Sequence, residues 1–364
     1  MKAFLERHII WLPFMIAIGL FLLTDVMISF TPVGQYLDDK VDNNLSRKLD
    51  NIRSDHPRQI DILALGTSRV NNGFKTETFE KSVPSGLNTY NMGLPGGSYY
   101  LIKLVLERHV HQYGKPKMVL LEVTDFLLNN DFVSTNNILY YRSILANQPE
   151  LASEIFNSPY LSMNDKQEIV LASLSGLYRY RSILAPDILA KMVLKGKSKD
   201  NRYFQGWNPK KISKDMKSDR NVLMNAKARE RRILSNYKQV DTERLENFLS
   251  YCQQENIPVV LFEYPSHPSY QGIFDRNAIS RPYYEAVQKV VSEYHVPFVD
   301  LKKELPHNVE GLFADSGHLS PAGAELMSGI LAHRVFENAT VSSWFQQHAT
   351  LTQVPAAVAA AGGR

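Results

Sequence analysis

The chain contains a single cysteine, Cys252, among its 364 residues. One cysteine cannot form an intramolecular disulfide, and it provides neither a cysteine-based zinc site nor a lipidated N-terminal cysteine. Charge imbalance is small as well, because the net charge is only +4, which neither favours nor opposes nucleic acid binding. We therefore expect any nucleophile in this chain to be a serine.

Common cofactor and metal motifs are also missing. Gly96-Gly97 lies near a predicted helix start, yet no Gly-Lys-Ser/Thr follows and the spacing does not fit a dinucleotide fingerprint. His109 and His111 are two residues apart, so on a helix they face different sides and do not form a chelating pair. We predict no metal site and no cofactor.

A long apolar run occupies the N-terminal region. Residues 9–30 are almost wholly apolar, and as a helix of about 33 Å they could cross a hydrocarbon core of about 30 Å. The flanking basic residues before it are Lys2 and Arg7, and the acidic residues toward and beyond its end are Asp25, Asp38 and Asp39. By the positive-inside rule the N-terminus is cytoplasmic and the remainder extracytoplasmic, in the periplasm.

No small-residue cleavage site of the A-x-A type follows the run. We therefore predict that residues 1–30 form an uncleaved signal anchor that contacts membrane lipid and crosses the cell membrane once. The alternative is a buried core helix of a soluble protein. The uninterrupted apolar stretch from Ile9 to Leu23 disfavours that alternative.

Short apolar runs alternate with helix-like stretches beyond the predicted anchor. The runs cover 60–65, 117–123, 258–263 and 296–300, and the helix-like stretches cover 100–113, 242–256 and 283–294. Alternating strands and helices with nearly continuous apolar strands indicate a parallel sheet covered on both faces. The predicted fold class is therefore α/β, with three layers in the order α/β/α.

The spacing of these elements predicts five segments. They are the anchor at 1–30, a stalk or linker at 31–58, a catalytic domain at 59–126 and 241–336, a helical insertion at 127–240 and a disordered tail at 337–364. Within the insertion, residues 191–232 are rich in lysine and arginine. We interpret them as a solvated surface near the membrane, with anionic lipid or an anionic polymer as alternatives. No nucleic acid partner is expected outside the cytoplasm.

The chemistry depends on two short segments far apart in the chain. Ser68, in Gly66-Thr67-Ser68-Arg69, directly follows the first predicted strand. Near the C-terminus, Asp315 precedes His318 by three residues, and Ser320-Pro321 predicts a capped helix start just beyond. A serine with a histidine base and an orienting aspartate forms the triad of acyl chemistry. The alternative for Gly-x-Ser alone is an ordinary strand-to-helix turn.

Other residues are predicted to surround this triad. The glycine-rich stretch 90–97 precedes a helix, so its backbone N–H groups could face a developing oxyanion, or it could simply be a tight connection with positive φ angles. Arg69 beside the nucleophile and His267 after a strand are predicted to line the same pocket. A surface ion pair and a loop residue, respectively, are equally good interpretations of these two.

The order of these segments resembles the SGNH hydrolase superfamily, over roughly 59–126 and 256–336. The family's serine block corresponds to Gly66-Thr67-Ser68, with threonine where aspartate is usual, and its final block matches at Asp315 and His318. Its two middle blocks correspond to Asn91-Met92-Gly93-Leu94-Pro95-Gly96 and to Glu122-Val123-Thr124-Asp125, where threonine replaces the oxyanion asparagine. The resemblance implies an SGNH or flavodoxin-like fold, with an oxyanion hole from Ser68, Gly96 and Thr124. It also implies that Asn91, Gly93 and Asp125 lie near the pocket.

The departures from that pattern, together with the predicted anchor, look more like the membrane-tethered SGNH-like proteins that accompany membrane-bound O-acyltransferases. That group includes the alginate acetylation proteins and the D-alanine-transfer protein of teichoic acid systems. The resemblance implies acyl transfer, with acetyl as the expected group, through Ser68 to a cell-surface or exported polysaccharide. The implied partners are the acyl donor, handed over by a membrane-bound O-acyltransferase, and the glycan acceptor.

Two other functions remain open from the sequence. A carbohydrate acetylesterase would use the same residues with water as the acceptor. A non-catalytic glycan-binding or scaffold protein of an acylation complex would keep the fold without the reaction. Sequence alone does not separate water from a sugar hydroxyl at the second step.

Overall fold

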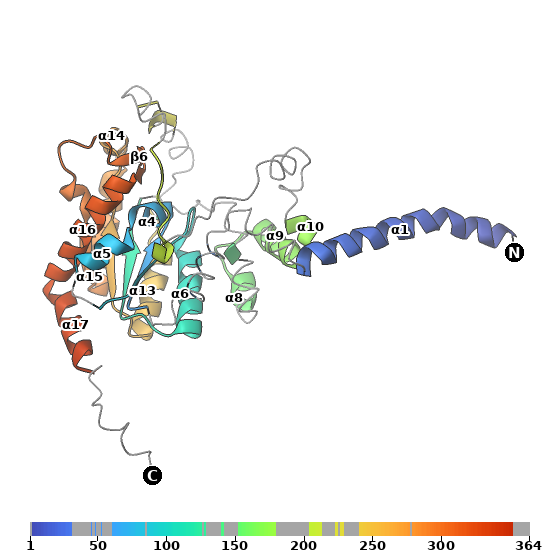
Figure 1. Cartoon of the computed structure of the whole chain (residues 1–364), viewed down its shortest axis with the longest axis horizontal. Coiled ribbons are helices and arrows are strands. Elements are labelled where there is room, and N and C mark those ends of the chain that lie inside the picture. Colours follow the sequence, from blue (N-terminus) through green and yellow to red (C-terminus); the bar gives the residue numbers. More distant parts are fainter. Residues whose placement is uncertain are drawn as a thin grey trace, which may run out of the picture. The chain divides into compact units, whose positions relative to one another are not determined.

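A computed structural model describes residues 2–30, 60–83, 86–125, 127–128, 152–179, 204–212, 240–276 and 279–351, with shorter stretches at 45, 48, 52, 140–141, 223–224, 226–228. The chain divides into two compact units (Figure 1). One unit comprises 1–50 and 135–202, and the other comprises 51–134 and 203–364. Each unit is described by itself.

The second unit is built on a parallel sheet of five strands. The strands are β1 (Ile62–Gly66), β2 (Thr89–Gly93), β3 (Met118–Glu122), β4 (Val259–Glu263) and β5 (Phe298–Asp300). Their spatial order is β2-β1-β3-β4-β5, and every neighbouring pair is parallel. This arrangement confirms the predicted parallel sheet. The carboxyl ends of all five strands lie at one edge, where parallel sheets carry their sites.

Helices cover both faces of this sheet. They are α4 (Ser68–Gly73), α5 (Thr76–Lys81), α6 (Tyr99–Tyr113), α13 (Glu243–Gln254), α14 (Pro268–Arg276), α15 (Ser280–Tyr294), α16 (Pro321–Glu337) and α17 (Ala339–Leu351). Short 3-10 turns are η2 (Phe204–Gly206) and η4 (Leu301–Glu304), and a small antiparallel hairpin joins β6 (Phe313–Asp315) to β7 (His318–Leu319). The three-layer α/β class is therefore as predicted.

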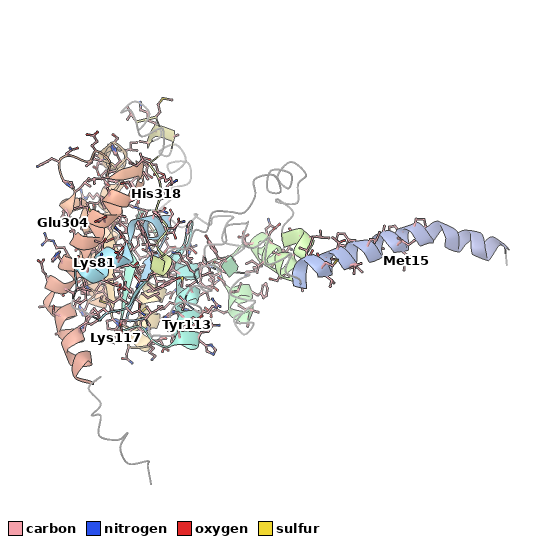
Figure 2. The ribbon with its side chains drawn as sticks, viewed as in Figure 1. Met15, Lys81, Tyr113, Lys117, Glu304 and His318 are labelled. Carbon is pink, nitrogen blue, oxygen red and sulfur yellow. The ribbon has the colours of Figure 1, made fainter. Side chains whose placement is uncertain are left out.

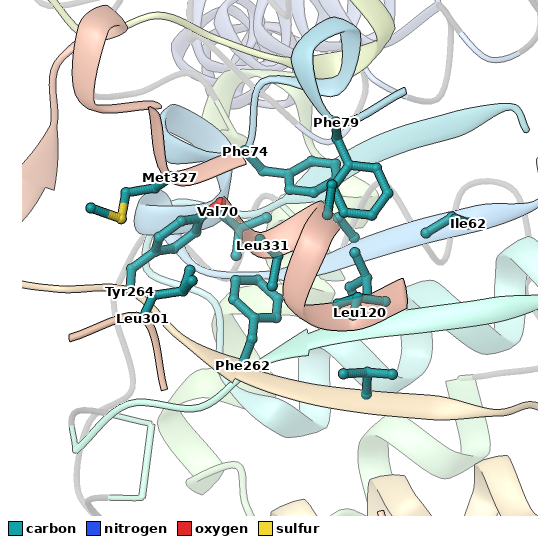
Figure 3. Close-up of a cluster of buried hydrophobic side chains, with 14 of the residues drawn as sticks. Ile62, Val70, Phe74, Phe79, Leu120, Phe262, Tyr264, Leu301, Met327 and Leu331 are labelled. Atoms are coloured by element: carbon teal, nitrogen blue, oxygen red, sulfur yellow. The ribbon is translucent and has the colours of Figure 1, made fainter. Parts of the chain in front are cut away.

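The main hydrophobic core lies between one face of the sheet and the helices α4, α5, α16 and α17 (Figure 3). Alternate strand residues such as Ile62, Ala64 and Leu120 point into it, because successive side chains of a strand face opposite sides. Phe74 and Phe79 pack with tilted rings, 5.1 Å between centroids, in the same core. This packing fixes α4, whose first residue is Ser68.

The first unit contains α1 (Lys2–Phe30), α8 (Ala152–Asn157), α9 (Met163–Leu174) and α10 (Gly176–Arg179). Helix α9 begins with a capping box in which Ser162 and Asp165 bond to each other's backbone N–H. Asp25 of α1 accepts hydrogen bonds from the Ser175 hydroxyl at 2.7 Å and the Leu177 N–H at 2.8 Å. The acidic residue at the end of the apolar run therefore connects α1 to the turn before α10.

Helix α1 covers the segment predicted as a membrane anchor. Within the described residues, no helix has both the length and the apolar character needed to cross a membrane. The predicted span at 9–30 is therefore not confirmed.

Two elements differ from the sequence expectations. The sequence predicts a glycine-rich loop over 90–97, whereas the structure places strand β2 at 89–93 and a turn after it. Asn91 and Gly93 are poor strand formers, so this short edge strand gives no apolar signal. The sequence also predicts a disordered tail from 337, but α17 forms over 339–351 with Val341 buried and Trp344 packed against the core. The i, i+3 spacing of those two residues was the available helical signal.

The division into two units separates parts of the predicted insertion at 127–240. Residues 135–202 group with the N-terminal unit, and residues 203–240 group with the sheet. Most of the basic stretch 191–232, most of the predicted stalk 31–58 and the chain beyond 351 lie outside the described residues.

Candidate active site

Ser68 lies where β1 ends and α4 begins. Thr67 is the N-cap of α4, and its hydroxyl accepts a hydrogen bond from the Arg69 N–H at 3.2 Å. Gly66 allows the strand to end against a buried carboxylate, since a Cβ there would lie 2.5 Å from Glu122 Oε2. The local sequence thus places the Ser68 side chain at the carboxyl edge of the sheet.

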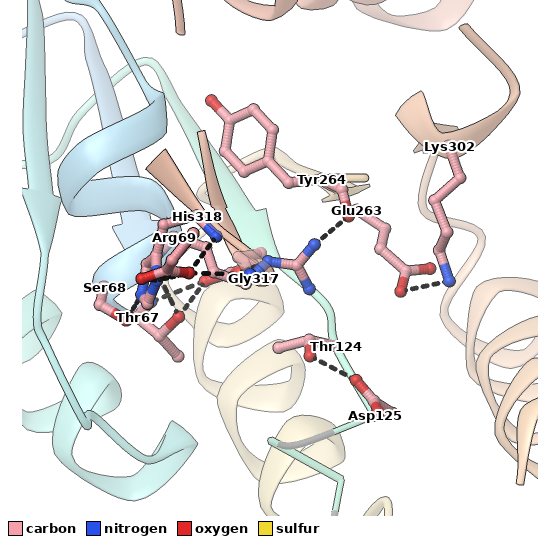
Figure 4. A network of polar contacts seen from close by, with 12 residues as sticks. Thr67, Ser68, Arg69, Thr124, Asp125, Glu263, Tyr264, Lys302, Gly317 and His318 are labelled. Atoms are coloured by element: carbon pink, nitrogen blue, oxygen red, sulfur yellow. Dashed lines mark hydrogen bonds and ion pairs between the residues drawn. The ribbon is translucent and has the colours of Figure 1, made fainter. Parts of the chain in front are cut away.

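Ser68, His318 and Asp315 lie in a hydrogen-bonded chain, of which Figure 4 labels Ser68 and His318. Ser68 Oγ is 2.8 Å from His318 Nε2, and His318 Nδ1 is 2.8 and 2.9 Å from the two carboxylate oxygens of Asp315. An ionised carboxylate can only accept, so this contact places the imidazole proton on Nδ1. The Nε2 lone pair then faces the Ser68 hydroxyl, as a general base requires.

The loop between β6 and β7 fixes the acidic residue of this chain. The backbone N–H groups of Gly317 and His318 donate to Asp315 Oδ1 at 2.8 and 3.0 Å. Immediately after β7, the Ser320 hydroxyl caps α16, as the sequence predicted, by accepting from the Gly323 N–H. The Asp315 carboxylate is therefore oriented by its own loop before it meets the imidazole.

A lysine that the sequence did not single out also contacts Asp315. Lys210 Nζ donates to Asp315 Oδ2 at 2.7 Å and lies 3.2 Å from His318 Nδ1. Lys210 belongs to residues 204–212. These residues lie within the predicted insertion at 127–240, but they group with the unit that contains the sheet. No signal in the sequence distinguishes it from its basic neighbours.

Glu122, at the end of β3, holds the turn that carries the nucleophile. Its Oε2 accepts from the Thr67 N–H at 2.7 Å and from the Thr67 hydroxyl at 2.9 Å, and its Oε1 lies 3.8 Å from Arg69 Nε. The side chain is fully buried, and this burial raises the pKa of Glu122 although Arg69 and Thr67 oppose the shift. This role was also missed from the sequence, where this block was examined only for an oxyanion donor.

A second set of polar contacts, which includes Glu263 and Lys302, lies to the right of Arg69 in Figure 4. The Arg69 guanidinium donates to the Tyr264 carbonyl oxygen, and Lys302 Nζ pairs with Glu263 Oε1 at 2.6 Å. Burial raises the pKa of Glu263 to about 7, even though Lys302 acts in the opposite direction. Arg69 thus braces α4 against β3 and β4, and lines a small cavity together with Asp125, Glu263, Ser266, Tyr283 and Lys302.

One protein family matches most of this chain. The chain matches a family described as a protein of unknown function, DUF1574, over residues 4–333. The chain belongs to this family. Among curated proteins, none shows a significant match.

Solved structures give distant matches. A lipase/acylhydrolase from Enterococcus faecalis is 12% identical with a TM-score of 0.35, covering 75% of this chain and 94% of its own. A GDSL-like lipase from Bacteroides thetaiotaomicron is 11% identical with a TM-score of 0.35, covering 80% of this chain and 96% of its own. The function proposed below is argued from the residues of this chain.

Gly96 and Thr124 were both predicted to contribute to the oxyanion hole, and the structure gives them different surroundings. Gly96 lies in the turn after β2 with a φ of 75°, a conformation that favours glycine. The Thr124 hydroxyl donates to Asp125 Oδ1 at 2.8 Å, and Figure 4 draws this pair below the Arg69 guanidinium. The Thr124 hydroxyl is thus engaged by Asp125, and Asp125 lines the small cavity beside Arg69.

Asn91 and Gly93 support α4 from beneath. Asn91 is buried, and its side-chain amide donates to the carbonyl oxygens of Val70 and Phe74 at 2.8 Å, while its Oδ1 accepts from the Gly93 N–H at 2.9 Å. A Cβ on Gly93 would lie 2.3 Å from the Asn71 backbone nitrogen. Both residues position the helix that carries Ser68.

His267 lies beside the loop of Asp315 and His318. Its backbone N–H donates to the Ser316 carbonyl at 3.1 Å, and its ring packs edge-on against Phe313 at 5.4 Å. No group of three or more His, Cys, Asp or Glu in the described part of the chain is arranged to hold a metal ion.

Proposed function

We propose that the chain forms an acyl-enzyme on Ser68 and passes the acyl group to a hydroxyl acceptor. The observation that carries this proposal is the 2.8 Å contact between Ser68 Oγ and His318 Nε2, with Asp315 on the other imidazole nitrogen. A nucleophile, a base and a group orienting the base are the parts that covalent acyl chemistry needs.

The proposed reaction moves one proton in each step. His318 Nε2 takes the Ser68 proton as Oγ attacks the acyl carbonyl, and the imidazolium then protonates the leaving group. The acceptor hydroxyl next gives its proton to Nε2 as its oxygen attacks the acyl-serine, and Ser68 recovers a proton when it leaves. Asp315 stabilises the imidazolium at each stage. The backbone N–H groups of Ser68 and Gly96 are the proposed oxyanion donors.

The acceptor that we propose is a hydroxyl of a cell-surface or exported polysaccharide, and the acyl group is acetyl. Support comes from the resemblance to SGNH-like proteins that accompany membrane-bound O-acyltransferases. In this proposal the O-acyltransferase hands the acyl group to Ser68. The Thr124 hydroxyl donates to Asp125 Oδ1, and the loss of one oxyanion donor costs about 3 kcal/mol. Such a site suits slow transfer better than rapid ester hydrolysis.

An acetylesterase is the second candidate. Ser68 is partly accessible and the His318 side chain is 12% exposed, so water can reach the acyl-serine. The same residues would then release the free acid. The transferase and the esterase would use the same triad. They differ only in the acceptor, which is a glycan hydroxyl for the first and water for the second.

Glycan analysis tests the transferase directly. In cells that carry Ser68→Ala, the O-acetyl content of surface polysaccharide should fall to background, because acyl transfer needs the serine oxygen. Mass spectrometry of polysaccharide from wild-type and variant cells measures this. Lower acetylation in the wild type than in the variant would support the esterase, and equal acetylation in both would contradict each enzymatic function.

We also propose that α1 attaches the chain to a membrane. Its large apolar side chains from Phe14 to Met27 are between 40% and 63% exposed, and Met15 projects outward in Figure 2. The full chain should then remain in the membrane pellet after carbonate extraction, whereas a chain without residues 1–30 should be released. Release of the full chain by carbonate would contradict this attachment.

A further inference from the structure

Residues 204–212 form a strap, a term used here for this segment only, that lies along α4. The Asn208 N–H donates to the Asn71 carbonyl at 3.0 Å, and the Asn72 side chain donates to the Asn208 carbonyl at 2.8 Å. The Trp207 indole N–H donates to the Asn72 carbonyl at 2.9 Å. The strap is therefore hydrogen-bonded to the end of the helix that begins with Ser68.

The first residues of the strap are fixed against β2 and α5. Gly206 has a φ of 81°, and a Cβ there would lie 2.1 Å from the Asn91 carbonyl oxygen, so only glycine fits this approach. The Gln205 amide donates to both carboxylate oxygens of Glu80 at 3.2 Å. Because residues 205–208 are all held, the strap directs the residues that follow, including Lys210, to one defined place.

We propose that Lys210, delivered by the strap, is a positioning residue that sets the charge balance of the Asp315–His318 pair. Lys210 Nζ is 2.7 Å from Asp315 Oδ2 and 3.2 Å from His318 Nδ1. The inference rests on the proposed function of Ser68, since it concerns the base that serves this serine. Lys210 acts through the pair and does not touch the reacting atoms.

The physical effect has two parts with the same sign. The Lys210 ammonium bound to Asp315 Oδ2 partly neutralises the carboxylate, so the carboxylate stabilises the His318 imidazolium less. The ammonium of Lys210 near His318 Nδ1 also repels the imidazolium directly. Both effects lower the pKa of His318, since a nearby like charge disfavours the charged form. His318 therefore stays a neutral base to lower pH with Lys210 than without it.

Two other titratable groups near the pair, Arg69 and His267, have partners of their own. Arg69 of α4 is directed at Glu122 and the Tyr264 carbonyl. The His267 ring, before α14, packs on Phe313 and its Nδ1 accepts from the Ser269 N–H at 3.2 Å. Substitution of Lys210 leaves these contacts in place, so a change in the titration of His318 reports the loss of the lysine.

The test is the titration of His318 in the full chain. With ¹³Cε1-labelled histidine, the His318 resonance is assigned by its loss in His318→Asn and followed against pH by NMR. Lys210→Met should raise the His318 pKa by about one unit. Lys210→Arg, which keeps the charge, and Lys211→Met, which removes an exposed neighbouring charge, should leave it within about 0.2 units of the wild type. An unchanged His318 pKa in a folded Lys210→Met chain would overturn the proposal.

A second readout separates this inference from the proposed function. The rate at which a fluorophosphonate labels Ser68 should show its acid limb shifted up by the same amount in Lys210→Met, with a plateau at high pH within a few-fold of the wild type. An equal loss of rate at every pH would mean a structural role only and would overturn the inference. Absence of labelling in all variants would instead overturn the proposed function, while the His318 titration would still decide the role of Lys210. If Lys210→Met does not fold, Lys210→Gln carries the same expectation.

Discussion

Replacement of His318 by alanine should lower the rate of Ser68 acylation by about 10⁴-fold or more. The variant loses the only side chain within hydrogen-bond distance of Ser68 Oγ that the described contacts provide for proton removal. A neutral serine hydroxyl is a weak nucleophile, so the chemical step slows while binding is preserved. The release of nitrophenol from an aryl acetate by the purified full chain measures this rate.

His307→Ala is the matched control for this variant. His307 is exposed in the loop before β6, so His307→Ala removes an imidazole of the same kind from a position outside the site. Its rate should stay within about two-fold of the wild type. A His318→Ala chain that keeps the wild-type melting temperature and a rate within ten-fold of the wild type would contradict the assigned base.

Gly93→Ala should destabilise the fold by about 3 kcal/mol. The new Cβ would lie 2.3 Å from the Asn71 nitrogen, 2.8 Å from its Cα and 2.9 Å from the Thr67 carbonyl oxygen. All three are backbone atoms of the nucleophile turn and α4, so no side chain can rotate away to relieve the overlap. Urea unfolding of wild type and variant measures the difference.

Gly329→Ala provides the opposite expectation for the same chemical change. Gly329 lies in α16, and a Cβ there would come no closer than 3.8 Å to Ser82 or Thr78. Alanine should therefore stabilise the fold by about 0.5 to 1 kcal/mol, through its higher helix propensity. Equal unfolding free energies for Gly93→Ala and wild type would show that α4 does not approach β2 as closely as described.

The strands and the triad segments were predictable because their signals are local. Continuous apolar runs before Gly66 and before Glu263 mark buried parallel strands, and an aspartate three residues before a histidine can meet it within one loop. The capping serine before Pro321 fixed the start of α16 for the same reason. These patterns need no knowledge of distant partners.

The supports of the site were not predictable, because each depends on contacts between distant segments. Glu122 looks like the end of an apolar strand, and only the sheet order places it under Thr67. Lys210 lies in a stretch with many other basic residues, and the bonds of its strap to Asn71 and Asn72 decide where it points. Conversely, Thr124 was placed by a family pattern, and the structure directs it at Asp125.

Covalent labelling tests the central claim most directly. The purified full chain and its Ser68→Ala variant are treated with a fluorophosphonate, and peptide mass spectrometry locates the adduct. The account predicts one phosphonyl group on Ser68 of the wild type, with none on the variant and far slower labelling of His318→Ala. A wild-type chain that remains unlabelled at Ser68, or an adduct that persists at another residue when Ser68 is absent, would contradict it.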